Sequence, residues 1–358
     1  MTDQITGGEA AYRILKANGI DTVFGLLGGS MLELYDAMYH GGDIAYVGAR
    51  DERAAGHMAD AWARMRGLPG VVLGAQAGPG VVNLVTAVAE AHLAYSPLVV
   101  IAGAISRCDH AKDTFQEVDQ VALFAPISKR SVMVSDAARL APILEDAIRL
   151  ANSGRRGPVV LHVPRDLFAE MVPAIEPTSV NIARPGPAAP QDVAAIATLL
   201  SNAERPVIFA GGGFKWGNGR EALTALAEKL EIPVVASTGH ADVMRHGHAW
   251  FAGQAGPRGN RVASRLTKEA DVMLVLGARL GFNSTFHSYD YVGAETRIAH
   301  IDIDGSAVGR YFPAEIAVQA DARLTAEALA ETSLRPAADA WRAAFRADMD
   351  SLWAERAE

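Results

Sequence analysis

The chain contains a single cysteine, Cys108, and no long uninterrupted run of apolar residues. One cysteine cannot form an internal disulfide, so nothing in the sequence indicates an oxidising compartment. No stretch approaches the roughly 20 apolar residues that a membrane-spanning helix requires. The N-terminal residues also lack the basic segment and apolar run of a signal peptide. We therefore expect a cytoplasmic protein without a membrane segment.

Clusters of basic residues are missing as well. The chain has 33 Lys and Arg against 41 Asp and Glu, a formal net charge of -8. Nucleic-acid-binding surfaces normally gather Lys and Arg on one face, so we expect no nucleic-acid partner. His240, His246 and His248 lie close together in the sequence, but their spacing matches no zinc signature. We predict no metal ligands in this chain.

The 358 residues, half of them hydrophobic, are sufficient for two domains with real cores. Short β-branched runs alternate with helical patterns, which predicts an α/β fold with two doubly wound parallel sheets, each covered on both faces. The expected strands are 23–26, 44–47, 71–75, 98–102 and 159–163, and then 207–210, 234–235, 272–276, 297–303 and 316–318. A segment rich in Pro and Ala separates the two sets. We predict domains at 1–172 and 191–335, a linker at 173–190 and a C-terminal helix at 336–358.

That last helix carries Trp341, Phe345, Met349 and Trp353 at intervals of four. The spacing predicts one apolar stripe, covered by the chain's own domains or by a partner.

The stretch from Glu52 to Asn83 contains the main candidate residues for a ligand-binding or catalytic site. Glu52 begins an expected helix, and the next strand leads into Gly78-Pro79-Gly80 and then Asn83. A carboxylate at a helix start complements the helix dipole and needs no ligand to explain it. Likewise, Gly and Pro make tight turns unaided. The alternative is that the missing side chains let the backbone approach a flat ring beside the carboxylate.

The pattern Glu-x-x-Ala-x-His-Met-Ala, followed by Gly-Pro-Gly-x-x-Asn, resembles the pyrimidine-binding domain of thiamine-diphosphate enzymes. Gly25-Leu26-Leu27-Gly28-Gly29 resembles the family's first loop, with Leu27 where proline is usual. Phe115-Gln116-Glu117-Val118-Asp119 resembles the acetolactate-synthase branch.

The resemblance implies a role for each of these positions. Glu52 would hydrogen-bond a ring nitrogen of the aminopyrimidine, which primes the cofactor for attack on a carbonyl. It implies catalytic roles for Glu52 and Gln116, substrate contacts from Phe115, Gln116 and Lys129, and cofactor contacts from Gly28, Gly29, Glu52, Gly78, Pro79, Gly80 and Asn83. In the family the phenylalanine and glutamine approach the substrate from a neighbouring subunit.

Residues 191–335 resemble the family's middle domain, which binds FAD in some members, an adenine nucleotide in others and nothing in the rest. The strand ends point to Gly212, Arg279, Asp302 and Asp321 as candidate contacts for FAD or an adenine nucleotide. An empty scaffold domain is an equally open interpretation.

The family holds Mg²⁺ and the cofactor's diphosphate with a Gly-Asp-Gly and a later Asn in a third domain. Asp304-Gly305-Ser306 is the nearest approach to that motif, but it follows a strand of the second domain. We therefore predict a separate diphosphate-binding subunit that carries the Mg²⁺ site, with a truncated product as the alternative, and homo-oligomerisation through the pyrimidine-binding domain.

The function that the resemblance implies is an acetolactate-synthase-like carboligase or lyase acting on small 2-oxo acids or acyl substrates. A decarboxylase, a sulfoacetaldehyde-type acetyltransferase and a 2-hydroxyacyl-CoA lyase remain open. Two further hypotheses are a non-catalytic, nucleotide-binding regulatory subunit and an oxidoreductase that uses only the second domain.

Overall fold

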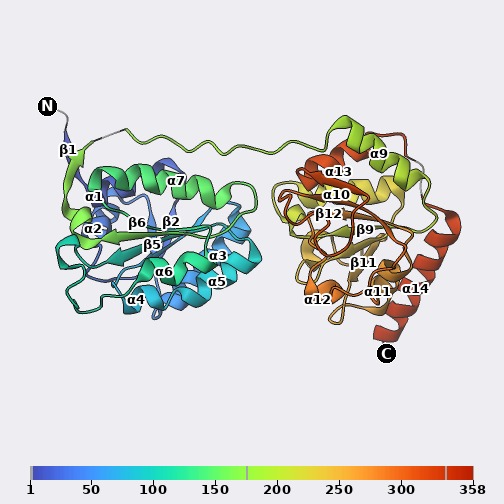
Figure 1. Cartoon of the computed structure of the whole chain (residues 1–358), viewed down its shortest axis with the longest axis horizontal. Helices are drawn as coiled ribbons and strands as arrows, with labels where there is room; N and C mark the ends of the chain where they lie inside the picture. Colours follow the sequence, from blue (N-terminus) through green and yellow to red (C-terminus); the bar gives the residue numbers. More distant parts are fainter. Residues whose placement is uncertain (1–2, 175, 335–336, 358) are drawn as a thin grey trace. The chain divides into compact units, whose positions relative to one another are not determined.

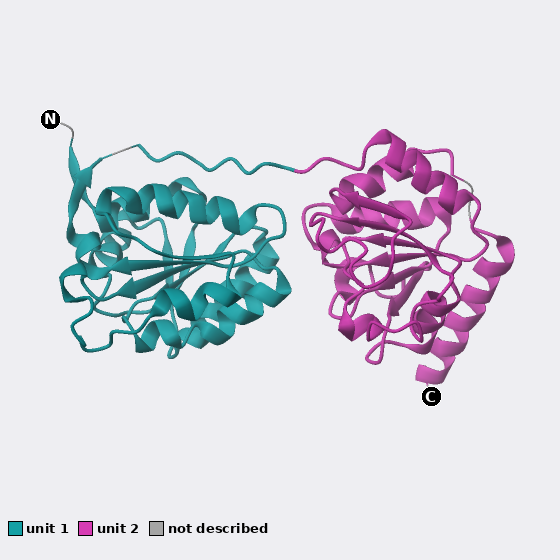
Figure 2. Ribbon diagram, in the orientation of Figure 1, with its two compact units in different colours: residues 1–184 teal, residues 185–358 magenta. Residues whose placement is uncertain are grey.

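Two six-stranded sheets organise the chain, one in each of two units (Figures 1 and 2). The units span Met1–Arg184 and Pro185–Glu358 and are called the N-terminal and C-terminal units below. The computed structural model describes residues 3–174, 176–334 and 337–357. The sequence-predicted boundary between 335 and 336 lies outside these described residues. Every pairing within the two sheets is parallel, which confirms the predicted α/β fold class.

The N-terminal unit has the strand order β3-β2-β4-β5-β7-β6. Its strands are β2 (Thr22–Leu26), β3 (Ala45–Gly48), β4 (Gly70–Gly74), β5 (Leu98–Ala104), β6 (Arg130–Met133) and β7 (Val159–Pro164). A separate antiparallel pair joins β1 (Gln4–Thr6) to β8 (Met171–Pro173). The edge strand β6 was not among the predicted strands.

Helices cover both faces of this sheet (Figure 1). Helices α1 (Gly7–Ala17), α2 (Leu32–Gly41), α7 (Leu140–Asn152) and α8 (Arg165–Ala169) pack on one face. Helices α3 (Glu52–Arg66), α4 (Pro79–Val82), α5 (Val85–Ala94) and α6 (Gln120–Phe124) pack on the other. Successive side chains of a strand point to opposite faces of the sheet, so each strand contributes to both cores. In β4, Val71 and Leu73 belong to the first core and Val72 to the second.

The switch point of this sheet lies between β2 and β4, because the chain continues from β2 to β3 on one side and from β4 to β5 on the other. In open parallel sheets the crevice at the carboxyl ends of such strands is where ligands bind. The turns after β2 and β4 are those that contain Gly28, Gly29 and Gly78, and Gly80 lies in α4 directly after the second turn.

The C-terminal unit has the strand order β11-β10-β9-β12-β13-β14, with its switch point between β9 and β12. Its strands are β9 (Pro206–Ala210), β10 (Val234–Ala236), β11 (Phe251–Gln254), β12 (Val272–Leu276), β13 (Arg297–Asp302) and β14 (Ile316–Gln319). Its helices are α9 (Pro190–Ser201), α10 (Gly219–Leu230), α11 (Arg261–Glu269), α12 (Phe282–Thr285), α13 (Ala322–Ala330) and α14 (Asp339–Ala357). The edge strand β11 was also not predicted.

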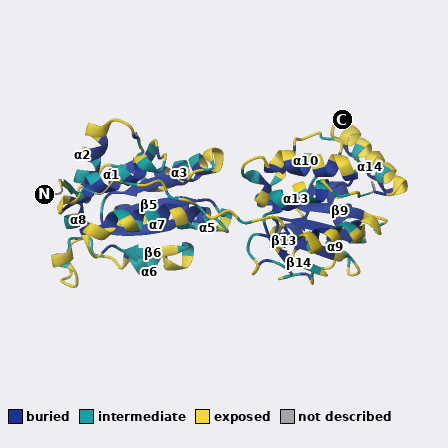
Figure 3. Cartoon of the chain, turned by 90° about the horizontal axis from the view of Figure 1, so that it is seen from above, coloured by how far each residue is buried: buried dark blue, intermediate teal, exposed yellow. Residues whose placement is uncertain are grey.

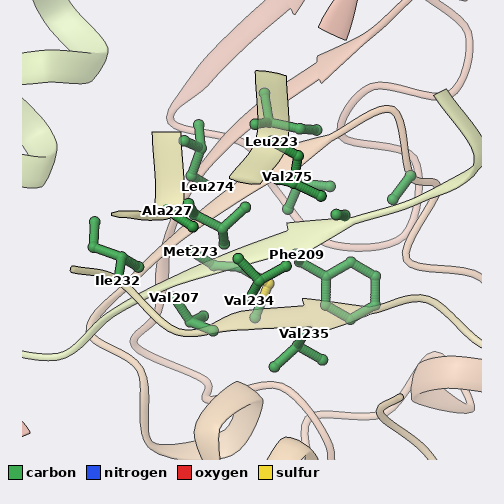
Figure 4. Close-up of a cluster of buried hydrophobic side chains, with 14 of the residues drawn as sticks. Val207, Phe209, Leu223, Ala227, Ile232, Val234, Val235, Met273, Leu274 and Val275 are labelled. Atoms are coloured by element: carbon green, nitrogen blue, oxygen red, sulfur yellow. The ribbon is translucent and has the colours of Figure 1, made fainter. Parts of the chain in front are cut away.

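The core of this unit combines aliphatic and aromatic side chains, and Phe209, Leu223, Val234 and Leu274 lie within it (Figure 4). Burial is greatest in the central strands, and β5 and β9 are buried along their whole length (Figure 3). Within the described residues, no helix is both long and apolar enough to cross a membrane.

Helix α14 packs on this unit through Trp341, Phe345 and Leu352, and the partly buried Met349 packs against the same core. Trp353 is 37% exposed. At about 100° per residue, position 353 lies about 120° around the helix from Trp341, whereas position 352 lies only about 20° away. The predicted stripe is therefore wrong at Trp353, because a repeat of four drifts around the helix.

Candidate active site

Glu52 is the first residue of α3 and is only 7% exposed. The preceding residue, Asp51, has extended backbone and accepts a hydrogen bond from Arg53 N at 2.8 Å, so Asp51 caps the helix. The carboxylate of Glu52 is therefore not used to cap the helix. Capping does not explain a glutamate at this helix start, although its charge still complements the helix dipole.

The carboxylate of Glu52 has one hydrogen-bonded oxygen and one oxygen against a glycine. Asn83 Nδ2 donates to Glu52 Oε2 at 3.0 Å. A Cβ placed on Gly80 would lie 2.8 Å from Glu52 Oε1. Any side chain at position 80 would therefore displace this carboxylate. The structure thus brings together Glu52, Gly80 and Asn83, as the sequence predicted.

The turn at Gly78 requires glycine. Its φ is +71°, and a Cβ there would lie 2.4 Å from the backbone oxygen of Gln116. Pro79 begins α4 directly after the turn, where a missing backbone N–H costs nothing. The segment after β5 that carries Gln116 is therefore packed against the turn after β4.

Gln120, which the sequence analysis missed, supports this turn. Its side chain is buried, accepts a hydrogen bond from Gly78 N at 3.0 Å and donates to Gly103 O at 3.1 Å. It directly follows the Phe115–Asp119 motif, which is the signal that could have pointed to it.

His162 completes this buried chain of hydrogen bonds. Its Nδ1 lies 3.1 Å from Gln120 Nε2 and its Nε2 lies 2.9 Å from Ser131 Oγ. Burial lowers the pKa of His162 to about 4, so the ring is neutral at pH 7. Ser131 Oγ donates to Val121 O, and therefore accepts from the Nε2–H of His162.

Gln76 is the second residue that the sequence analysis missed. Its Oε1 accepts a hydrogen bond from Gly29 N at 3.3 Å, and its Nε2 donates to Gln116 Oε1 at 2.5 Å. Its position two residues before the Gly78 turn was the available signal.

The two glycines of the first loop have different surroundings. A Cβ on Gly28 would lie 2.9 Å from the backbone of Ala75, so Gly28 is needed for packing. A Cβ on Gly29 would have no neighbour within 4 Å, and Leu27 is 71% exposed. The packing of the protein therefore explains Gly28 and leaves Gly29 open to a ligand.

The structure does not gather all three predicted substrate residues. Phe115 is 84% exposed. Lys129 precedes β6, and its Nζ donates to Leu150 O at 2.6 Å and Ser153 O at 2.7 Å at the end of α7. This is the amino edge of the sheet, opposite the turns of the site. Within this unit Lys129 therefore lies apart from Gln116 and closes the end of a helix, and its contact with a substrate stays a prediction.

In the C-terminal unit, the four predicted contacts all lie at or just after the carboxyl ends of strands. Gly212 follows β9, and exposed Arg279 follows β12. Asp302 ends β13 and accepts a hydrogen bond from Asp304 N, while Asp321 caps α13 by accepting from Leu324 N, both at 2.9 Å. Local backbone contacts thus account for both carboxylates, and the FAD or adenine-nucleotide site stays a prediction.

The N-terminal unit therefore presents a buried carboxylate beside glycine turns at the switch point of a parallel sheet. A model of the N-terminal TPP binding domain of thiamine pyrophosphate enzymes matches residues 5–123. A model of the central domain of the same enzymes matches residues 193–329. The chain belongs to the thiamine pyrophosphate enzyme family.

Relatives within this family include acetolactate synthases. The chain is 34% identical to the acetolactate synthase large subunit of Parasynechococcus marenigrum and 34% identical to the acetolactate synthase isozyme 3 large subunit of Escherichia coli. It is also 34% identical to the sulfoacetaldehyde acetyltransferase of Rhodobacter capsulatus. These alignments cover 98%, 92% and 98% of this chain, but 58%, 58% and 60% of the relatives. The chain thus spans less than two thirds of the length of these three relatives.

Proposed function

We propose that this chain supplies the pyrimidine-binding and middle domains of a thiamine-diphosphate-dependent carboligase or lyase that acts on 2-oxo acids, with acetolactate-synthase-like chemistry. One observation carries the proposal. Glu52 is buried, is not used as a helix cap, and is held by Asn83 with its second oxygen against Gly80.

The residues of the site fit the aminopyrimidine of the cofactor. Gly80 leaves space that a Cβ would fill beside Glu52 Oε1, and a Cβ on Gly29 would have no protein atom within 4 Å. When bound, thiamine diphosphate supplies a carbon nucleophile and an electron sink for bonds beside a carbonyl.

Glu52 would hold a proton between Oε1 and a ring nitrogen. Oε1 is the oxygen available for this role, because Oε2 accepts the hydrogen bond from Asn83. Asn83 thereby orients the carboxylate, and the buried position keeps bulk water from competing for the proton.

We propose further that Mg²⁺ and the diphosphate are held by a diphosphate-binding domain outside residues 1–358, carried by a separate subunit. Residues 1–358 contain no Gly-Asp-Gly sequence. Assembly of two copies through the pyrimidine-binding domain is part of the same proposal.

The test mixes this chain with a separately produced diphosphate-binding domain from the same source, thiamine diphosphate and Mg²⁺, and follows the consumption of pyruvate. We expect turnover by the mixture and none by either part alone. Glu52→Gln should abolish it, whereas the matched control Glu221→Gln, in the first turn of α10, should leave it unchanged. Unchanged turnover in the Glu52→Gln mixture would overturn the proposal.

An acetyltransferase is the second candidate, because the relative named sulfoacetaldehyde acetyltransferase is as similar as the acetolactate synthases. Offering sulfoacetaldehyde alongside pyruvate distinguishes the two. Consumption of sulfoacetaldehyde, with no condensation of two pyruvate molecules, would favour the acetyltransferase. The visible absorbance of the purified chain tests whether the middle domain holds FAD, because a bound flavin is yellow.

A further inference from the structure

One side-chain amide, that of Gln76, links three turns of the N-terminal unit. Gly29 lies after β2, Gln76 after β4 and Gln116 after β5. Gln76 accepts a hydrogen bond from Gly29 N at 3.3 Å and donates one to Gln116 Oε1 at 2.5 Å. The three turns that border the candidate site are therefore tied together at one half-buried residue.

The backbone group in this chain of hydrogen bonds fixes the direction of both side-chain amides. A backbone N–H can only donate, so the atom of Gln76 that faces Gly29 must be its oxygen. The nitrogen of Gln76 then faces Gln116, and because it donates, it must meet the oxygen of Gln116. Gln116 is left with its NH₂ group directed elsewhere.

That NH₂ group has no acceptor in the part of the chain that the structure describes, although the rest of Gln116 is firmly held. The backbone of Gln116 is in the left-handed region, with φ +71°, and its carbonyl oxygen lies against Gly78. A non-glycine residue keeps such a conformation only where its surroundings impose it. Gln116 is therefore constrained through both its backbone and its side chain.

We infer that Gln76 is a positioning residue that turns Gln116 into a hydrogen-bond donor toward the substrate. Its consequence is a requirement on the substrate: the group that meets Gln116 must carry an acceptor oxygen, such as a carboxylate or another oxyanion. This inference rests on the proposed function. It adds that Gln116 is the hydrogen-bond donor and the substrate the acceptor. Gln76 acts through Gln116 and does not itself touch the substrate.

A double-mutant cycle tests this indirect role. Gln76→Met, Gln116→Met and the double variant are compared in the complex with the diphosphate-binding domain, with pyruvate as the probe. We expect Gln76→Met to raise KM about tenfold or more, with little change in kcat, because an oriented hydrogen bond to a charged group is lost. In the Gln116→Met background, the same change should alter kcat/KM by less than about twofold. An equal effect in both backgrounds, or no effect in either, would overturn the inference.

Gln76→Glu is a second variant in case the first does not fold. It keeps an acceptor for Gly29 N but presents a carboxylate to Gln116, whose NH₂ must turn toward it. The oxygen of Gln116 then faces the substrate, and we expect KM for pyruvate to rise about tenfold or more. The matched control for added charge is Gln191→Glu, at an exposed position of α9, which should leave KM unchanged. Wild-type KM in Gln76→Glu would contradict the inference.

The hydrogen bond can also be tested without activity, by NMR of the side-chain amides in this chain alone. Replacing the acceptor in Gln116→Met should shift the side-chain NH₂ signals of Gln76, which are assigned by their loss in Gln76→Met. Unshifted signals would refute the link. A complex in which these signals shift as expected but pyruvate is not consumed would instead refute the proposed function.

Discussion

Asn83 Nδ2 donates a hydrogen bond to Glu52 Oε2 across 3.0 Å, joining two residues 31 positions apart. The bond leaves Glu52 Oε1 beside Gly80, in the first turn of α4. The two ends of the motif that suggested a cofactor site are thus in direct contact, and one of them orients the other.

Replacing Asn83 by Ala should weaken the binding of thiamine diphosphate to the assembled complex. Glu52 loses its oriented partner while its carboxylate stays buried, so we expect the Kd to rise about tenfold. Cofactor titration measures the change. Asn202→Ala, at the exposed end of α9, is the matched control and should leave the Kd unchanged. Equal Kd values for Asn83→Ala and the wild type would show that this contact does not prepare the site.

Gly80→Ala should damage both the fold around the site and cofactor binding. The added Cβ would lie 2.8 Å from Glu52 Oε1 and 3.1 Å from Gln76 Cβ, so the carboxylate must move. We expect a loss of about 1–3 kcal/mol in the free energy of unfolding, as overpacked positions show. Urea denaturation measures this, and Gly186→Ala, which has no neighbour within 4 Å, provides the control.

Gly29→Ala tests whether this glycine is needed for cofactor binding or for the stability of the fold. No protein atom lies within 4 Å of the added Cβ, so the unfolding midpoint should stay the same. If the cofactor approaches the backbone here, its affinity should fall about tenfold, because the methyl group occupies the approach. An unchanged cofactor affinity would remove Gly29 from the predicted contacts.

His162 should make the stability of the N-terminal unit depend on pH. Its pKa in the folded chain is about 4, below the ordinary value of 6.5, because burial disfavours the charged ring. The unfolded chain therefore binds the proton more readily, and the stability present above pH 6.5 is lost as the pH falls toward 4. Between pH 7 and pH 5 this group should account for about 2 kcal/mol.

Denaturation of the wild type and of His162→Gln at both pH values measures this contribution. The fall in stability between pH 7 and pH 5 should be smaller in the variant by that amount. The same fall in both proteins would show that His162 is not buried as a neutral ring.

The two tryptophans of α14 should differ in their contribution to stability. Trp341 is buried, and its Nε1 donates to Pro206 O at 2.9 Å, whereas Trp353 is 37% exposed. We expect Trp341→Ala to cost about 3–5 kcal/mol in the free energy of unfolding and Trp353→Ala less than about 1 kcal/mol. Equal losses would mean that the helix packs on a different face.

Most of the fold followed from the sequence because its central strands are short β-branched runs buried on both faces. The edge strands did not follow, for physical reasons. Strand β6 is partly exposed along its length, and β11 contains Gly253 with φ +88° beside a register shift. An edge strand pairs with only one neighbouring strand and need not be hydrophobic on both faces. Neither β6 nor β11 therefore shows the continuous hydrophobic run by which the central strands were predicted.

The site was predictable where its residues are close in sequence and lie on regular elements. Glu52 begins α3 and Asn83 directly follows α4, and the sequence pattern predicts both helices and their order. Gln76 and Gln120 were missed because the partners that tie them to the site, Gln116 and Gly78, lie 40 and 42 residues away in irregular turns. Their contacts depend on how the segment after β5 folds back against the turn after β4. A local sequence pattern does not predict that path.

The most direct test of the account is a crystal structure of this chain with a diphosphate-binding domain and thiamine diphosphate bound. The account predicts that Glu52 Oε1 lies within hydrogen-bonding distance, about 2.6–3.2 Å, of a pyrimidine ring nitrogen, while Asn83 keeps its bond to Oε2. A bound cofactor whose pyrimidine lies away from Glu52, with that carboxylate contacting only protein or water, would contradict it.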